Sequence, residues 1–264
     1  MIDVAINIEP LYPGMDICEK IARVAEAGFQ AVEFWSWDDR DLAQIKQTCR
    51  KHGVKVRAFS ATKSFSLCDR EHRKEYLDWV RQSVDAAKEL DCDTLILFPN
   101  HFMPEGCADF RNKYSHEAMI AGITHNLTCM IPMLEENNIT VLLEPLCNAG
   151  SDAGMSVTDT SVGADIVRAV NSRYVKLLCD VFHMQMMHGN LLQNITENLD
   201  IVPYIHIADA PDRHEPGTGE INFDFLLRKI KDSDFDGTVC FEYFPEGDTE
   251  AGFETVKKYC ELMK

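Results

Sequence analysis

The fold is indicated most clearly by residues 175–208, which read VKLLCDVFHMQMMHGNLLQNITENLDIVPYIHIA. Two short apolar runs, residues 175–180 and 204–208, flank a segment of helix length that ends near Asn198. A strand, a helix and a second strand in this order predict two parallel strands joined by a βαβ crossover.

The same alternation of short apolar runs and longer amphipathic segments continues toward both ends of the chain. Further strands are predicted at Asp3–Ile8, Ala31–Phe34, Val54–Phe59, Thr94–Phe98, Thr140–Glu144 and Thr238–Glu242. Further helices are predicted at Asp16–Ala27, Asp41–His52, Arg70–Leu90, Ser115–Asn137, Thr160–Val170, Phe223–Ser233 and Glu250–Met263. Eight strand–helix units in 264 residues fit one (β/α)8 TIM barrel, which typically needs about 250 residues. A doubly wound open sheet is the alternative.

Composition sets limits on the class of protein. About 45% of the residues are hydrophobic, which is enough for a large core, and no run reaches the roughly 18 apolar residues of a membrane helix. No Pro-, Gly- or Ser-rich linker divides the chain, so we expect one domain over residues 1–264. The start, MIDVAINIEP, lacks a basic stretch followed by an apolar block, which predicts a cytoplasmic protein. The ten cysteines form no C-x-x-C pair and are expected to be buried thiols.

The net charge of −17 bears on the partners of the chain. A surface this acidic repels phosphate backbones and lacks the basic patch typical of nucleic-acid-binding proteins. It is compatible with a small neutral or metal-chelated substrate. We therefore expect a small-molecule partner and neither nucleic acid nor membrane.

Polar side chains lie at the ends of four consecutive predicted strands. The fifth strand ends in Glu144, the sixth ends in Asp180, the seventh carries His206, and the eighth ends in Glu242. The carboxyl ends of barrel strands form the active site of such proteins. Three carboxylates meeting there would repel one another unless a cation lay among them. We therefore expect these four residues to hold one divalent metal ion, Mn(II) or Mg(II), with Co(II) as a further option.

Two neighbouring segments add polar residues to this end of the barrel. His183 follows Asp180 in the segment DVFH, and Arg213 lies in HIADAPDRHEPGTGE, the loop after the seventh strand. Arg213 can hold a substrate oxygen or orient a ligand carboxylate. Early strand ends carry further polar or aromatic residues that stay outside the predicted site: Asn7, Glu33, Trp35 and Ser60.

At these residues the sequence resembles the xylose-isomerase-like superfamily of metal-dependent barrels, and within it the hydroxypyruvate isomerase family. The segments that carry the resemblance are LLEPL around Glu144, DVFHMQMMHGNL from Asp180, HIADAPDRHEPGTGEINF from His206 and CFEYFP around Glu242. The first half matches more loosely, through GFQAVEFW. The resemblance implies the four metal ligands named above, substrate contacts from His183 and Arg213, and a homodimer or homotetramer.

The activity expected from this resemblance is proton transfer next to a carbonyl group. The substrate is a small hydroxy-carbonyl compound or ketose, and the metal stabilises an enediolate by Lewis-acid action. Glu144 and Glu242 are the two expected bases. Return of the proton to the adjacent carbon gives aldose–ketose isomerisation, whereas return to the opposite face of the same carbon gives epimerisation.

Several alternatives remain at this point. Bacterial hydroxypyruvate isomerases carry Gln at the position of His206, and a His there is more similar to ketose 3-epimerases of the same superfamily. The apurinic endonuclease group needs extra histidines after strands three and four, which end here in FSAT and LFPN, although Asp212 and His214 fit its later motif. A nuclease and a non-catalytic sugar-binding barrel are therefore less favoured. No Gly-rich phosphate loop or Lys/Arg cluster follows strands seven and eight, so we expect an unphosphorylated substrate.

Overall fold

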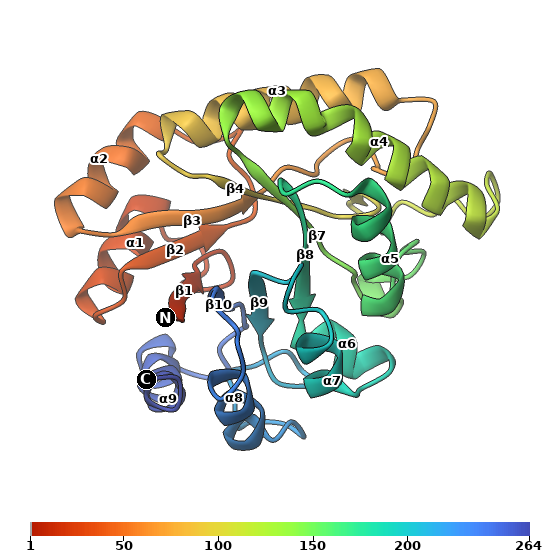
Figure 1. Cartoon of the computed structure of the whole chain (residues 1–264). Coiled ribbons are helices and arrows are strands. Elements are labelled where there is room, and N and C mark those ends of the chain that lie inside the picture. The colour runs from red at the N-terminus through yellow and green to blue at the C-terminus, as the bar shows by residue number, and fades with distance from the viewer. Residues whose placement is uncertain (1) are drawn as a thin grey trace.

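A computed structural model describes residues 2–264 of the chain and contains a closed barrel of parallel strands ringed by helices (Figure 1). The strands follow one another round the barrel in the order β1-β10-β9-β8-β7-β4-β3-β2. The predicted (β/α)8 fold is therefore confirmed, and the open sheet is excluded because β1 pairs with both β2 and β10.

The barrel strands agree with the predicted ones to within about two residues at each end. They are β1 Asp3–Asn7, β2 Ala31–Phe34, β3 Lys55–Ser60, β4 Thr94–Leu97, β7 Thr140–Leu143, β8 Val175–Asp180, β9 Tyr204–Ile207 and β10 Thr238–Phe241. The helices are α1 Ile17–Glu26, α2 Leu42–His52, α3 Arg73–Glu89, α4 His116–Asn137, α5 Thr160–Val170, α6 Val181–Met187, α7 Leu191–Thr196, α8 Phe223–Lys231 and α9 Thr249–Glu261. In the described residues, none of these helices has both the length and the apolar content needed to cross a membrane.

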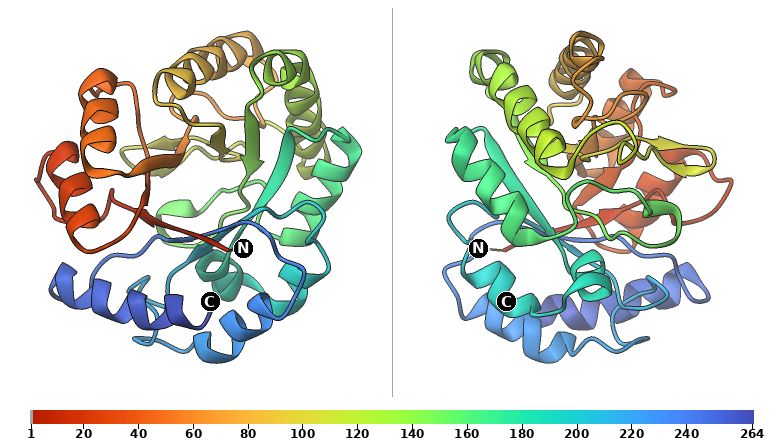
Figure 2. Two further views of the ribbon diagram at one scale, coloured as in Figure 1. Left: turned by 60° about the vertical axis from the view of Figure 1, so that its left-hand side comes forward. Right: turned by 90° about the vertical axis from the view of Figure 1, so that its right-hand side faces the viewer.

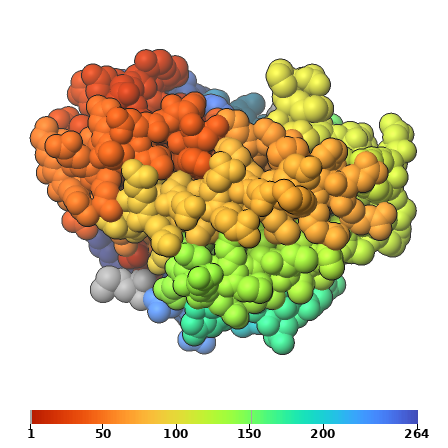
Figure 3. Space-filling model, turned by 90° about the horizontal axis from the view of Figure 1, so that it is seen from above, coloured from red at the N-terminus to blue at the C-terminus, as the bar shows by residue number. Residues whose placement is uncertain are grey.

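Two local features differ from the sequence-based expectation. The helical segment after β8 is two short helices, α6 and α7, because Gly189 and Asn190 take left-handed backbone conformations between them. In addition, the loop after β4 contains a small antiparallel hairpin of β5 Phe102–Met103 and β6 Gly106–Cys107. In Figure 3, α2, α3 and α4 form a continuous orange-to-green band, and the yellow segment that contains the hairpin projects at its edge.

Side-chain alternation along the strands separates the barrel interior from the outer layer. Each strand contributes one side chain to an interior cluster of Ala5, Ala31, Ala58, Ile96, Leu142, Leu178, Tyr204 and Cys240. The intervening strand residues pack against the surrounding helices, which enclose the barrel in both views of Figure 2. In β9, for example, Ile205 and Ile207 face the helices, so Tyr204 and His206 point inward. The interior is therefore filled, and the polar residues lie above it at the strand ends.

Candidate metal centre and cavity

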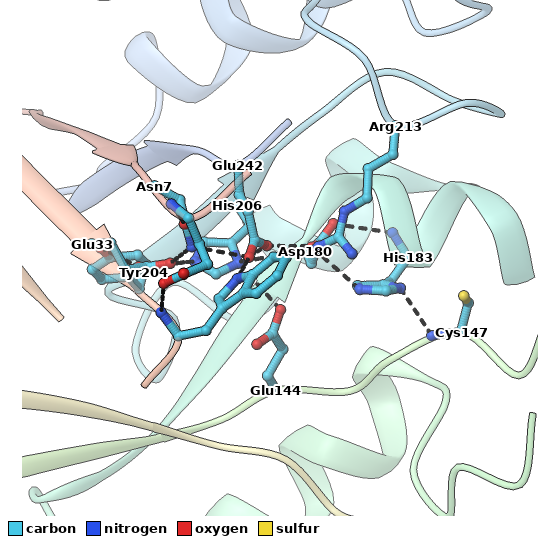
Figure 4. Close-up of polar contacts among 12 residues, drawn as sticks. Asn7, Glu33, Glu144, Cys147, Asp180, His183, Tyr204, His206, Arg213 and Glu242 are labelled. Carbon is cyan, nitrogen blue, oxygen red and sulfur yellow. Dashed lines mark hydrogen bonds and ion pairs between the residues drawn. The ribbon is translucent and has the colours of Figure 1, made fainter. Parts of the chain in front are cut away.

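The four residues predicted as metal ligands lie together at the carboxyl end of the barrel (Figure 4). One ligand atom from each of Glu144, Asp180, His206 and Glu242 lies within 4.8 Å of the other three, and all four residues are buried. The barrel backbone sets their positions. Asp180 and His206 are register partners, and the N–H groups of Glu144 and Glu242 donate to carbonyls of the neighbouring strands. The donor set of three carboxylates and one imidazole suits a divalent cation.

The two ring nitrogens of His206 face different partners. Nδ1 lies 3.2 Å from Glu144 Oε1 and 3.1 Å from Glu242 Oε2. Nε2 lies 3.1 Å from the carboxylate of Glu33, which is 1% exposed. An Nε2–H donated to Glu33 leaves Nδ1 as the nitrogen directed at the ligand set. A carboxylate behind a metal-ligating imidazole commonly fixes its tautomer and orientation.

Glu33 is itself held by two further hydrogen bonds. The hydroxyl of Tyr204 donates to Glu33 Oε2 at 2.7 Å, and Asn7 Nδ2 donates to Glu33 Oε1 at 2.7 Å. Asn7 Nδ2 also lies 3.0 Å from Glu242 Oε1, so it joins the two carboxylates. Asn7 and Glu33 lie outside the site predicted from the sequence, although both are at early strand ends. The signal for Glu33 was a carboxylate inside the apolar run AVEF of β2.

Glu242 is held by several side chains outside the ligand set. Arg213 Nη2 lies 2.6 Å from Glu242 Oε2 and 3.4 Å from Asp180 Oδ2. Trp35 Nε1 donates to Glu242 Oε1 at 2.6 Å. Arg213 has a left-handed backbone conformation, φ 59°, and its guanidinium lies 5.1 Å from the ring centroid of Phe182. Arg213 and Trp35 thus both fix the orientation of this carboxylate.

His183 lies on the opposite side of Asp180 from His206. Asp180 caps helix α6, because its Oδ1 accepts the His183 N–H at 3.0 Å. The side chain of His183 accepts the Cys147 N–H at Nδ1, at 3.2 Å, which leaves its proton on Nε2. His183 and Arg213, the two residues predicted to contact substrate, both line the cavity beside the ligand set.

Burial and mutual repulsion govern the electrostatics of the cluster. Burial raises the pKa of Glu144 to about 7, and His206 opposes this rise. Burial favours the neutral form of Glu242, but Arg213 and His206 outweigh it and hold its pKa well below the usual value. Burial disfavours the charged form of His206, but Glu33, Glu242 and Glu144 raise its pKa well above its ordinary value. Both raised pKa values favour bound protons, which reduce the repulsion among the clustered carboxylates. A cation bound at the same place would reduce this repulsion instead.

A cavity of about 730 Å³ opens over the ligand set. Its lining includes Glu144, Glu242, His183, Arg213 and Asp152. Asp152 lies in the short turn Gly150–Asp152 after β7, and its contribution had no signal in the sequence. Trp35 and Ser60, which were also left outside the predicted site, line the cavity as well.

The fold and the site together define a class of protein. It is a closed β/α barrel with a candidate metal centre of three carboxylates and one imidazole at its strand ends. Within that class, the chain belongs to the xylose isomerase-like TIM barrel family, whose model matches residues 21–259. The family expected from the sequence is thereby confirmed.

Relatives extend along nearly the whole chain. The hydroxypyruvate isomerase of Escherichia coli (strain K12) is 29% identical over 98% of this chain and 100% of its own length. A putative hydroxypyruvate isomerase of Danio rerio is 30% identical over 91% of this chain and 89% of its own. The crystal structure of an AP endonuclease, family 2, from Brucella melitensis matches with a TM-score of 0.88 at 27% identity, over 98% and 99% of the two chains. The chain is therefore similar to hydroxypyruvate isomerases along nearly its whole length, and its fold matches that of a protein described as an AP endonuclease.

Proposed function

We propose that this chain is a divalent-metal-dependent isomerase that moves a proton next to the carbonyl group of a small hydroxy-carbonyl or ketose substrate. The observation that carries the proposal is the convergence of Glu144, Asp180, His206 and Glu242 within 4.8 Å under an open cavity. The similarity to hydroxypyruvate isomerases along nearly the whole chain supports the same reaction class.

The four clustered residues would hold the cation, with Mn(II) or Mg(II) as our preferred ions and Co(II) as a third. When bound, the ion supplies Lewis-acid polarisation of a carbonyl and its neighbouring hydroxyl. Asp180 has a further role in this proposal, because its Oδ1 also fixes the start of α6 and with it the position of His183.

Glu144 and Glu242 are the proposed bases. They come from β7 and β10, which are separated by β8 and β9, so they approach the cavity from different directions. One takes the proton from the carbon next to the carbonyl, and one returns it. Return to the adjacent carbon, together with transfer of the hydroxyl proton from one substrate oxygen to the other, completes an aldose–ketose isomerisation. Both side chains line the cavity, as this role requires.

His183 and Arg213 are the proposed substrate contacts. The Nδ1 of His183 accepts the Cys147 N–H, which leaves the proton of the ring on Nε2. Nε2 lies 3.7 Å from Asp180 Oδ2, too far for a hydrogen bond, so its N–H can donate to a substrate oxygen. Arg213 directs Nη2 at Glu242 and lies at the cavity wall, where its remaining N–H groups can hold a second oxygen. These contacts would place the reacting carbon between the two glutamates.

A ketose 3-epimerase is the second candidate, and one observation favours it. His206 is an imidazole held between Glu33 and the ligand set, at the position where we expect Gln in a bacterial hydroxypyruvate isomerase. Epimerisation needs the same proton removal but return to the opposite face of the same carbon. Two bases on separate strands suit that step equally well.

Proton NMR in D2O tests both candidates. The Mn(II)- or Mg(II)-loaded protein is incubated with hydroxypyruvate, tetruloses, pentuloses and hexuloses, beside a metal-stripped control. Metal-dependent loss of a proton signal next to a carbonyl supports the proposal, and the product distinguishes isomerase from epimerase. Absence of exchange with all of them, despite bound metal, rejects both candidates.

Three expectations remain predictions. They are one domain over residues 1–264, a homodimer or homotetramer, and a cytoplasmic location. Light scattering coupled to gel filtration measures the second directly, and limited proteolysis tests the first.

A further inference from the structure

We infer that the cavity takes an uncharged ketose longer than three carbons, with an apolar far end that lies against an aromatic wall. This wall consists of Trp35, Trp37, Trp79, Phe98, Phe102 and Phe244. The inference rests on the proposed function, because it names the substrate of the same site. Three independent features of the cavity carry it: its size, its lining and its charge.

The cavity is larger than a three-carbon substrate requires. Its volume of about 730 Å³ lies in the upper part of the roughly 300–1,000 Å³ range of pockets that hold drug-sized ligands. Hydroxypyruvate has seven non-hydrogen atoms, so it would leave most of this space to solvent. Ligand pockets usually bury most of the surface of their ligand. A longer carbon chain is therefore the better match in size.

The lining away from the ligand set is largely aromatic, with Ser36, Ser60, Thr62 and Lys63 as its polar members. Trp37 stacks on Trp79 with ring centroids 5.1 Å apart, and Phe98 meets Phe102 edge to face at 5.9 Å. The ring centroids of Trp35 and Phe244 are 6.2 Å apart. This pair lies next to the candidate metal centre, because Trp35 Nε1 donates a hydrogen bond to Glu242. Such aromatic faces bind C–H groups and apolar substituents.

Exposed apolar residues of the chain concentrate at this cavity. Six large hydrophobic side chains are exposed among the described residues, and four of them line it: Trp35, Phe102, Met186 and Phe244. Met103, a fifth, is next to Phe102 in the β5–β6 hairpin. Clustered exposed apolar surface around a concave site is typical of a binding surface. A ligand that buries this surface under an apolar group would bind more favourably than one that places a charged group against it.

Each positive side chain in the described cavity lining is paired with a carboxylate of the protein, so none is left to bind a substrate anion. Among the described lining residues the cations are Lys63 and Arg213. Lys63 is paired with Asp38, and Arg213 with Glu242 and Asp180. A bound dication and Arg213 together balance the three negative charges of Glu144, Asp180 and Glu242. Asp152 adds a further carboxylate to the wall. A substrate carboxylate or phosphate would therefore enter without a compensating positive charge.

Binding and chemistry can be measured separately on the same four compounds. These are a hexulose, the corresponding 6-deoxyhexulose, the hexulose 6-phosphate and hydroxypyruvate. All three tryptophans of the chain line the cavity, so quenching of tryptophan fluorescence in the Mg(II)-loaded protein reports binding there. Proton exchange in D2O reports turnover. We expect the 6-deoxyhexulose to bind at least about tenfold more tightly than either anion, and as tightly as the hexulose or more so.

A variant of the hairpin tests the aromatic wall. Phe102→Ala removes one ring from the projecting β5–β6 hairpin and is expected to raise the Kd and KM for the 6-deoxyhexulose about tenfold with kcat unchanged. The matched control is Phe225→Ala, on α8, which is 51% exposed and lies outside the cavity lining. An equal effect of the two variants, or none from Phe102→Ala, overturns the inference.

The outcomes separate this inference from the proposed function. Tighter binding of hydroxypyruvate or of the 6-phosphate overturns the inference, as does failure of both uncharged ketoses to quench fluorescence. Exchange with hydroxypyruvate in that case still supports the proposed isomerase. Tight binding of the 6-deoxyhexulose without proton exchange separates the two in the other direction. The cavity then binds an uncharged ketose as inferred, and the proposed proton transfer is wrong.

Discussion

The two halves of the barrel contribute differently to the candidate site. β7 to β10 supply the four clustered side chains, each at or next to a strand end. β1 and β2 supply Asn7 and Glu33, which contact those side chains from behind. The loops and helix of the first half also supply most of the aromatic wall, including Trp35, Trp37 and Trp79. The second half thus carries the proposed chemistry, and the first half orients it and shapes the cavity.

This difference has a physical basis in how each half meets the barrel interior. Small side chains, Ala5, Ala31 and Ala58, fill the interior on β1 to β3. Tyr204 on β9 fills part of the remaining space and reaches Glu33 on β2 with its hydroxyl. The small residues of the first half thus give room for a network that crosses the barrel and fixes His206.

The largest expected effect lies in the second half, at the proposed bases. Glu144→Gln and Glu242→Gln should fold but lose about 10²–10⁴ in kcat, because a neutral amide cannot accept the proton. Steady-state kinetics on the metal-loaded variants measures this, with Glu246→Gln, an exposed residue after β10, as the control. Near-normal turnover in either variant would remove that glutamate from the mechanism.

The next effect is on metal affinity and concerns Asp180. Asp180→Asn keeps the Oδ1 that caps α6, so the fold around His183 should survive. It removes a negative charge from the ligand set, and we expect Mn(II) affinity to fall by more than the roughly 10–100-fold typical of an outer-shell change. Calorimetric titration with Mn(II) gives the value. Unchanged metal content would reject Asp180 as a ligand.

The sequence was sufficient for the parts of the site that follow from local pattern. Charged residues after short apolar runs identified Glu144, Asp180, His206 and Glu242, because the strand ends of a parallel barrel meet at one edge. The same pattern predicted the barrel itself, since each run of β-branched residues is followed by a segment of helix length. Register and sheet order were not needed for either inference.

Other parts of the site depend on contacts between distant segments. Tyr204 and Glu33 are 171 positions apart, and nothing in either local sequence indicates their hydrogen bond. The aromatic wall combines residues from several loops, so it has no periodic signature. The β5–β6 hairpin is only two residues per strand, which is too short for an alternation pattern to reveal.

A variant in the first half tests whether that half orients the ligands. Glu33→Gln should lower Mn(II) affinity about 10–100-fold. One carboxylate oxygen becomes an N–H₂ group, which in one orientation of the amide faces the Nε2–H of His206 and in the other faces the N–H₂ of Asn7. Mn(II) titration measures this, and circular dichroism checks the fold. Tyr204→Phe, which leaves the carboxylate in place, is the matched control and should have a smaller effect. Equal affinity in Glu33→Gln and the unmodified protein would show that β2 takes no part in holding His206.

The smallest expected effect tests whether the two halves are otherwise equivalent. Asp41 caps α2 in the first half and Asp248 caps α9 in the second, each exposed and each accepting a backbone N–H in the first turn. Loss of such a cap typically costs about 1 kcal/mol of folding free energy. We expect Asp41→Ala and Asp248→Ala to lower the free energy of unfolding by similar amounts and to leave Mn(II) affinity and kcat unchanged. Urea unfolding and metal titration measure the two quantities. If Asp248→Ala also reduced turnover, the contribution of the second half would extend beyond its strand ends into the helices, and the asymmetry of the barrel would not be confined to the ligand set.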